Sequence, residues 1–515
     1  MKPQLFHSLK TYKKADLFHD LMAGLMVAII ALPLSIALGI QSVPAEVSSN
    51  GIQFGIITAI VAGFFISALG GSKYQIGGPT AAFVVILYGY LADPNIGILG
   101  LAIAGIMAGV LLIAMGFLRF GNVMKFFPYP ITIGFTTGIG ITLLIGQIKD
   151  FCGFQSSGTE AIAKLVSYIQ NIQTFDFATF VIGVLGLACV IGLPKLSKKI
   201  PAAFVALIVC TGATLALNEF AGANIATIGS KYGDVKAGFF PVDFSAISSI
   251  RFSALIVPAI VIAFLCAIES LLSATVAAGM TGTNFDANQE LVGQGAANIF
   301  SSLVGGLPAT GAIARTAASI ENSAKSPLAG IFHALFLLIM YFVLMNVMKF
   351  IPLAVFSAIL ISVAINMSRF PLFIKLTKFG IRDVIILIVT CVLTVVFDLT
   401  YGVIGGVAVT FIANAKNLSI GLKIEKDETA DSSVVKAKGT LFFLNANKLI
   451  DELSKAFDSA QTVTLDMCEI ERVDETALEK LATFCHKIQS QGKTLKFTNC
   501  NQQTQKRFDK FFKIF

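Results

Sequence analysis

Charged residues are scarce in this chain of 515 residues, at 13%, whereas a soluble globular domain usually carries about 25%. Hydrophobic residues make up 55%, and the mean hydropathy is +0.81. This balance excludes a soluble enzyme, a disordered protein and a nucleic-acid-binding protein. The net charge of +8 would otherwise point to a polyanionic partner.

Side chains suited to metal or covalent chemistry are also few. The chain has four scattered histidines and eight cysteines, and no CxxC motif occurs. We therefore expect buried free thiols, no structural metal, no cofactor and no enzymatic activity. The basic N-terminus precedes an apolar stretch without a small-residue cleavage site, so we expect no cleavable signal peptide.

The charged residues are unevenly distributed along the chain. Residues 421–515 hold 29 of them, out of 38 basic and 30 acidic residues in all. The first 420 residues are long apolar runs separated by short charged clusters. The distribution predicts an N-terminal segment (1–20), a polytopic helical membrane region (21–420) and a small soluble domain (421–515).

The apolar runs predict about fourteen membrane spans, since a span needs about 20 apolar residues, or fewer if the helix stops inside the membrane. They are 21–40, 52–70, 79–91, 96–118, 128–148, 177–193, 201–220, 253–279, 289–305, 310–321, 327–347, 352–367, 381–398 and 399–418.

The charges between these spans predict their orientation. With both termini in the cytoplasm, the inner segments hold sixteen Lys and Arg residues and the outer segments hold six. This excess follows the positive-inside rule. The six predicted outer residues are Lys149, Lys164, Lys231, Lys236, Arg251 and Lys349.

Two spans are short, and each follows a Gly/Pro-rich stretch. One comes after residues 76–80 and the other after residues 305–311, and they are the third span of each half. Such a pair indicates a transporter built from inverted repeats. The unpaired N–H groups at two helix starts would make an anion site, with Pro79 and Pro308 suited to the helix starts and with Thr80 and Thr310 supplying hydroxyls.

Two ionisable residues lie within the predicted spans. Arg315 is about one turn into the second short helix, and Glu269 lies in the long span 253–279. Ionisable residues inside a membrane are functional candidates by default. Glu269 and Ser273 share a helix face, where they could bind a cation or exchange a proton. The alternative is that Glu269 and Arg315 pair only to hold two helices together.

The C-terminal region alternates between strand and helix patterns. Strands are predicted at 434–445, 462–467 and 493–498, and helices at 446–458, 475–490 and 501–512. Val463, Leu465 and Met467 should face one way, since alternate strand residues share a face. The pattern predicts a small cytoplasmic α/β domain.

Six sequence blocks form a specific set by their order and spacing. They are Leu32-Pro33, Gly78-Pro79-Thr80, Glu269–Ser273, Asp286–Leu291, Gly293–Asn298 and Pro308–Thr316. In this order they resemble the SulP family of anion transporters, whose animal relatives include pendrin and prestin, and the resemblance covers nearly the whole chain.

The C-terminal region resembles a STAS domain through Leu465-Asp466-Met467 and Val473–Leu478. In phosphorylatable STAS proteins the loop reads Asp-Ser-Ser-Gly or Asp-Thr-Ser-Gly, whereas here it reads Asp474-Glu475-Thr476-Ala477. Thr476 occupies the phosphoacceptor position, but Glu475 and Ala477 depart from the pattern. We therefore expect an ordinary loop that opens a helix rather than a phosphorylation switch.

The resemblance implies a 7+7 inverted repeat and a homodimer. Spans 1–4 and 8–11 would form a core subdomain, and spans 5–7 and 12–14 a gate subdomain. In some relatives the acidic position of the eighth span, here Glu269, serves the coupling cation. The implied anion site comprises Leu34, Leu38, Thr80, Ala81, Gly311, Ala312, Ile313, Ala314 and Arg315.

We therefore expect a secondary active transporter of small anions of the sulfate, bicarbonate or dicarboxylate class. It would work by alternating access in the plasma (inner) membrane, coupled to a proton or a sodium ion at Glu269 and Ser273. One alternative is a carrier similar to nucleobase–cation symporters, which has no need of Arg315. Another is an anion sensor that signals through the STAS domain, which could bind a cytoplasmic regulatory protein.

Overall fold

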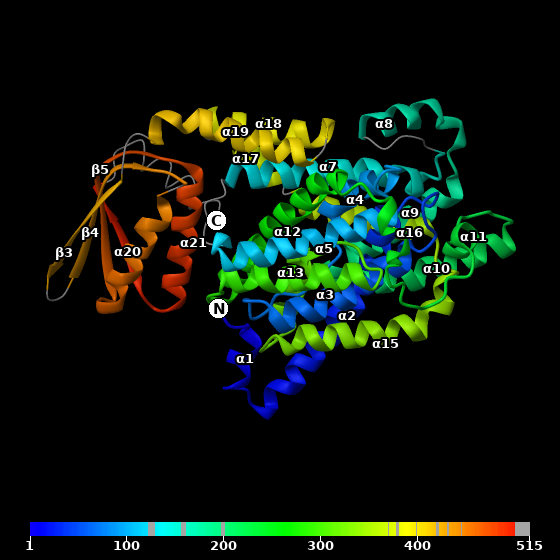
Figure 1. Ribbon diagram of the computed structural model, residues 1–515, viewed down its shortest axis with the longest axis horizontal. Helices are drawn as coiled ribbons and strands as arrows, with labels where there is room; N and C mark the ends of the chain where they lie inside the picture. The colour runs from blue at the N-terminus through cyan, green and yellow to red at the C-terminus, as the bar shows by residue number, and fades with distance from the viewer. Residues whose placement is uncertain are drawn as a thin grey trace. The chain divides into compact units, whose positions relative to one another are not determined.

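The computed structural model describes residues 1–121, 129–155, 161–196, 201–368, 370–376, 381–397, 399–418, 422–429, 432–443 and 445–499. Helices dominate the fold (Figure 1). The chain divides into two compact units, one of residues 1–124 with 139–368 and one of residues 125–138 with 369–515.

Each of the predicted spans overlaps a helix of the structure. The helices are α2 (Lys14–Ser42), α3 (Gly51–Leu69), α4 (Ala81–Ala92), α5 (Gly97–Phe117), α7 (Tyr129–Cys152), α9 (Phe177–Leu196), α10 (Ala202–Phe220), α12 (Phe252–Thr281), α13 (Ala287–Leu303), α14 (Ile313–Glu321), α15 (Leu328–Met348), α16 (Leu353–Met367), α18 (Ile381–Val396) and α19 (Leu399–Leu418).

Within the described residues, nine helical stretches are long and apolar enough to cross a bilayer by length and composition. The chain is therefore a polytopic helical membrane protein. Short helices connect the long ones, and they are α1 (Gln4–Leu9), α8 (Ala161–Gln170), η1 (Ile172–Thr174), α11 (Ile228–Tyr232), η2 (Phe244–Ser249) and α17 (Phe370–Leu376).

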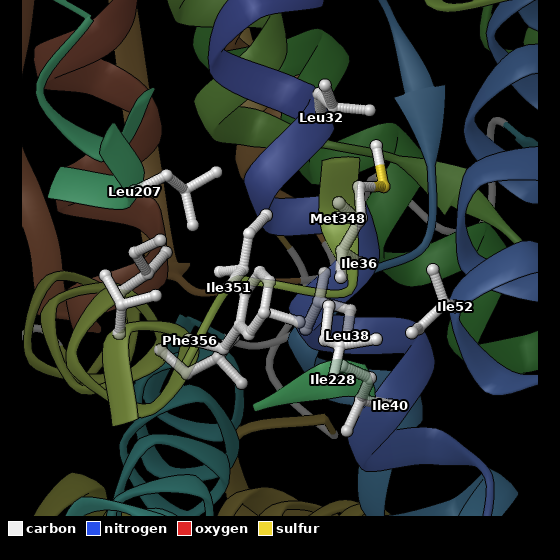
Figure 2. Close-up of a cluster of buried hydrophobic side chains, with 14 of the residues drawn as sticks. Leu32, Ile36, Leu38, Ile40, Ile52, Leu207, Ile228, Met348, Ile351 and Phe356 are labelled. Carbon is white, nitrogen blue, oxygen red and sulfur yellow. The ribbon is translucent and has the colours of Figure 1, made fainter. Parts of the chain in front are cut away.

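The first unit is a bundle in which α13 packs against α3 and α5, and α15 packs against α2 and α3. Figure 1 shows these helices side by side. A large buried apolar cluster joins α2 and α3 to α10, α15 and α16 (Figure 2). Leu38 and Phe356 are among its members, so α2 is fixed against helices from both halves of the sequence.

The two short helices begin at a ribbon of two very short strands. Strand β1 (Gly77–Gly78) pairs antiparallel with β2 (Thr310–Gly311). The sequence had indicated that the two prolines stand at the helix starts, but neither is the first residue of its helix. Pro79 precedes the N-cap Thr80, and Pro308 precedes β2, because the chain first makes this ribbon.

The STAS region belongs to the second unit and contains a four-stranded sheet in the order β3-β4-β5-β6. β3 and β4 are antiparallel, and β4, β5 and β6 are parallel. Two helices pack on the sheet and on each other. The elements are β3 (Lys423–Thr429), β4 (Ser432–Leu441), α20 (Ala446–Ser459), β5 (Thr462–Val473), α21 (Glu475–Ser490) and β6 (Thr494–Thr498).

Predicted features of this domain are largely confirmed. Val463, Leu465 and Met467 are all buried in its core. Strand β3 was missed, because its sequence Lys-Ile-Glu-Lys-Asp-Glu-Thr has few apolar residues. The helix predicted at 501–512 lies outside the described residues.

Candidate functional site

The ribbon of β1 and β2 brings the starts of α4 and α14 together. Gly77 is opposite Gly311, and Gly78 is opposite Thr310. Thr80 is the N-cap of α4 and Ala312 is the N-cap of α14, and neither side chain accepts a hydrogen bond from its own helix. Helix starts without caps leave backbone N–H groups and a partial positive charge available to an anion.

Arg315 is the only charged side chain of the implied anion site, and it is 1% exposed. Its Nη1 donates to the carbonyl oxygen of Gly77 at 3.0 Å, and its Nη2 donates to Ser35 Oγ at 3.0 Å. A Cβ atom at Gly78 would lie 1.6 Å from Nη1, so glycine is needed there to leave room for the guanidinium.

No ion pair joins Arg315 to a carboxylate among the residues that the structure describes. Its Nε also has no hydrogen-bond partner there. Two neutral acceptors cannot neutralise a guanidinium, and a buried charge without a counterion is costly. The positive charge of Arg315 is therefore not neutralised by these residues, and a bound anion would supply the missing negative charge.

Glu269 of α12 binds the start of α4 rather than Arg315. Its Oε2 accepts a hydrogen bond from Thr80 Oγ1 at 2.9 Å, and its side chain is half-buried. The proposed helix-pairing ion pair between Glu269 and Arg315 is thus absent from the described structure. Instead, Glu269 is linked through Thr80 to one of the two facing helix starts.

Ser273 shares a helix with Glu269 but has a different partner. Its hydroxyl is fully buried and donates to Thr316 Oγ1 at 3.3 Å. Thr316 Oγ1 in turn accepts the N–H of Ile76 at 3.2 Å. Ser273 therefore ties α12 to α14, whereas Glu269 ties α12 to α4.

The remaining implied site residues differ in burial. Ala81, Gly311 and Ala312 are buried, Leu34 and Ile313 are half-buried, and Ala314 is exposed. Leu38 is 1% exposed and belongs to the apolar cluster of Figure 2. Within the implied site, Ala314 on α14 is thus the accessible residue, while Leu38 on α2 is closely packed.

Polar residues outside the predicted anion site hold the ribbon in place. Ser270 Oγ lies 2.7 Å from Thr310 Oγ1 and accepts the N–H of Gly311 at 3.3 Å. Asn298 binds the backbone of Ala309 twice, donating to its oxygen and accepting its N–H, each at 2.9 Å. These bonds fix the direction in which α14 begins.

Glu290 is a second buried carboxylate, and its contacts are structural. It accepts the N–H groups of Gly71 and Ser72 at 2.9 and 3.0 Å and a bond from Gln294 Nε2 at 2.8 Å. Glu290, Gln294 and Asn298 recur every four residues along α13, and all are fully buried. This polar stripe was the sequence signal for the supporting network, since residues four apart share a helix face.

Thr476 lies in the second unit, near the start of α21, and is 3% exposed. Its Oγ1 accepts the N–H of Tyr129, at the start of α7, at 2.9 Å. Asp474 is the N-cap of α21 and accepts the N–H groups of Ala477 and Phe443. Burial raises the pKa of the Asp474 carboxyl to about 7. A kinase would have to displace Thr476 from α7 to reach its hydroxyl.

Comparison with protein families identifies two regions. Residues 17–390 match the sulfate permease family, and residues 423–512 match the STAS domain. The chain is 35% identical to a putative sulfate transporter, YvdB, of Bacillus subtilis, over 96% of this chain and 93% of that protein. It is 31% identical to the bicarbonate transporter BicA of a Picosynechococcus species, over 80% of this chain and 73% of that protein.

Solved structures show the same fold. The transmembrane domain of a cyanobacterial bicarbonate transporter BicA superposes with a TM-score of 0.68 at 28% identity, covering 76% of this chain and 98% of that one. The murine anion transporter Slc26a9 in the inward-facing state gives a TM-score of 0.71 at 18% identity, covering 98% of this chain and 89% of that one.

Proposed function

Because the chain belongs to the sulfate permease family and carries a C-terminal STAS domain, we propose that it is a secondary active transporter of small anions. The anions would be of the sulfate, bicarbonate or dicarboxylate class. The observation that carries this proposal is the buried guanidinium of Arg315, which has no carboxylate partner among the described residues and lies beside two facing helix starts.

Binding would be electrostatic and would rely on groups already in place. The N–H groups at the starts of α4 and α14 would donate to the anion, and Arg315 would supply a full positive charge from behind the ribbon. Arg315 already uses Nη1 and Nη2 on Gly77 and Ser35. We therefore assign it a through-space role, in which it raises the potential of the site without contacting every substrate.

Glu269 would couple the anion to a cation. An ionised carboxylate bound to Thr80, the N-cap of α4, repels an anion at the same helix start. A proton on Glu269, or a sodium ion beside it and Ser273, would remove this repulsion and favour loading. The loaded site would then move between the two sides of the membrane by alternating access.

The resemblance that favours this function also favours a fourteen-span, 7+7 inverted repeat with core and gate subdomains. We further propose a homodimer in the plasma membrane with both termini cytoplasmic. The named relatives are a putative sulfate transporter and a bicarbonate transporter. Sulfate and bicarbonate are both small oxyanions that match a site made of N–H donors and one cation.

The experiment is uptake of labelled sulfate, bicarbonate, succinate and uracil into proteoliposomes that contain the full chain. Saturable uptake of at least one anion, without uptake of uracil, is the expected result. Uracil uptake alone would establish a nucleobase carrier instead. Anion binding without movement of any of these solutes would establish a sensor.

A further inference from the structure

A cavity of about 340 Å³ lies beside the outer half of α4, away from the ribbon. Its walls come from α2 and the loop that follows it, and from α4, α7, α8 and α11, and all of its lining residues belong to the first unit. The charge bias along the chain places its lysines on the predicted outer side of the membrane. Its volume is large enough for a small anion together with several water molecules.

The charged lining is asymmetric. Lys149, Lys164 and Lys231 face Glu46 and Asp150, which leaves one positive charge in excess. Lys231 Nζ lies 3.6 Å from Asp150 Oδ1, so these two largely offset each other. Within the described chain, no ion pair involves Lys149 or Lys164. Lys164 instead lies over the ring of Tyr88, 5.2 Å from its centroid.

The side chain of Gln147 on α7 gives a second, independent indication of a ligand in this cavity. It lines the cavity and is fully buried, yet neither Nε2 nor Oε1 has a hydrogen-bond partner in the described structure. Buried amides are almost always hydrogen-bonded, because a buried polar group without a partner loses its hydrogen bonds to water and gains none in return. An amide left unpaired at the wall of a cavity indicates that a ligand or ordered water supplies its partner.

An apolar layer separates this cavity from the ribbon. Val84 and Leu143 line the cavity and also belong to the buried cluster that contains Leu38 and Ala81. An ion in the cavity would therefore have to cross packed apolar side chains to reach the start of α4. Among the described residues, none of the ribbon residues lines the cavity.

We propose that this cavity is a second anion site, in which Lys164 and the amide of Gln147 hold an external anion before it reaches the ribbon. The inference rests on the proposed transport function and specifies where the substrate is loaded. Burial and the nearby ammonium of Lys149 lower the pKa of Lys164. A bound anion would oppose both effects and would shield the Lys164 amine from modification.

The kinetic test uses Lys164→Gln and the nearly isosteric Gln147→Glu, which adds a repelling charge. The control is Lys349→Gln, which removes a charge from the same predicted side but outside the cavity. Sulfate and bicarbonate uptake is measured in right-side-out spheroplasts and in inverted vesicles. Both test variants should raise the external half-saturation concentration about tenfold and leave the internal value unchanged, because Lys164→Gln loses one charge-assisted contact and Gln147→Glu adds repulsion of similar size.

The binding test does not depend on transport. Purified full-length protein is acetylated with a sulfosuccinimidyl ester during titration with sodium sulfate, and mass spectrometry compares Lys164 with Lys349. Protection should saturate at Lys164 but not at Lys349, and it should disappear in Gln147→Glu. Protection in a protein that moves no anion would refute the proposed function but support this site.

A combination of two results would refute the second site. If Lys164 and Lys349 react alike at all sulfate concentrations, and the half-saturation values of both test variants match the wild type, the second site is refuted. In that case normal anion uptake by the wild type would leave the proposed function standing. Two substitutions on different helices guard against misfolding of either one.

Discussion

Replacing Arg315 by methionine should weaken anion binding without destabilising the anion-free protein. A unit anion about 6–8 Å from a guanidinium gains about 2–3 kcal/mol at an effective dielectric constant of about 20. Losing this energy corresponds to roughly a 30- to 100-fold increase in Kd. We therefore expect sulfate or bicarbonate to bind Arg315→Met at least 30-fold more weakly.

Stability should change in the opposite sense from binding. Arg315 is fully buried, and among the described residues its hydrogen-bond partners are Gly77 O and Ser35 Oγ. Methionine fills much of the same volume and removes the cost of burying an unpaired charge, which is several kcal/mol. The substitution also leaves two acceptors, Gly77 O and Ser35 Oγ, without their donor, which costs about 1–3 kcal/mol each. The two effects offset each other, so the melting temperature without anion should stay the same or rise.

The assay is thermal unfolding of the full chain with and without sulfate or bicarbonate. At an anion concentration 100 times the wild-type Kd, binding stabilises the wild type by about 2.7 kcal/mol. The variant should gain only about 0.4–0.9 kcal/mol. Lys195→Met, at an exposed position, is the control. Equal anion-dependent stabilisation in both proteins would refute the electrostatic role of Arg315.

Three further predictions concern the residues that support the site and the STAS domain. Asn298→Leu removes both bonds to Ala309 and should lower the unfolding free energy by about 2–4 kcal/mol; an unchanged melting temperature would contradict this. Thr476→Val should speed hydrogen exchange of the Tyr129 amide, because the accepting hydroxyl is lost, whereas Thr476→Ser should not. Asp474 binds its proton more tightly in the folded domain, since its pKa is raised from 3.8 to about 7. Stability of the STAS domain should therefore be greatest below about pH 4 as far as Asp474 is concerned, and should fall as the pH rises through about 7. Hydrogen exchange of α21 between pH 4 and 8, corrected for the intrinsic rate, measures this trend, and Asp474→Asn should flatten it.

The length of the apolar runs made the membrane helices predictable. Apolar runs of about 20 residues have few alternatives to a membrane helix, and each predicted span overlaps a helix of the structure. The short third and tenth helices were predictable because Gly and Pro interrupt both halves at matching positions. Strand β3 was not, because its partner β4 rather than its own composition places it in the sheet.

The candidate site was predictable in its residues but not in its bonds. Arg315 and Glu269 were conspicuous as charges in apolar runs, and their mutual pairing was a natural expectation. The ribbon instead inserts Gly77 and Gly78 beside Arg315, while Thr80 takes the carboxylate of Glu269. These partners are about 190–240 residues away in sequence, so no local pattern reports them. The polar stripe on α13 was visible in its spacing but indistinguishable from an ordinary polar helix face.

The most direct test of the account is uphill anion accumulation by the wild type and by Glu269→Gln. Proteoliposomes that contain the full chain are given an inward proton gradient or an inward sodium gradient, each imposed separately. We predict that the wild type accumulates sulfate or bicarbonate against its own gradient under one of the two. Glu269→Gln should bind and exchange the anion but lose that accumulation. Its amide mimics the neutral carboxyl, but it cannot take up and release the coupling cation in each transport cycle. Wild-type accumulation by the variant would contradict coupling through Glu269, and failure of the wild type to accumulate any of these anions under either gradient would contradict the account as a whole.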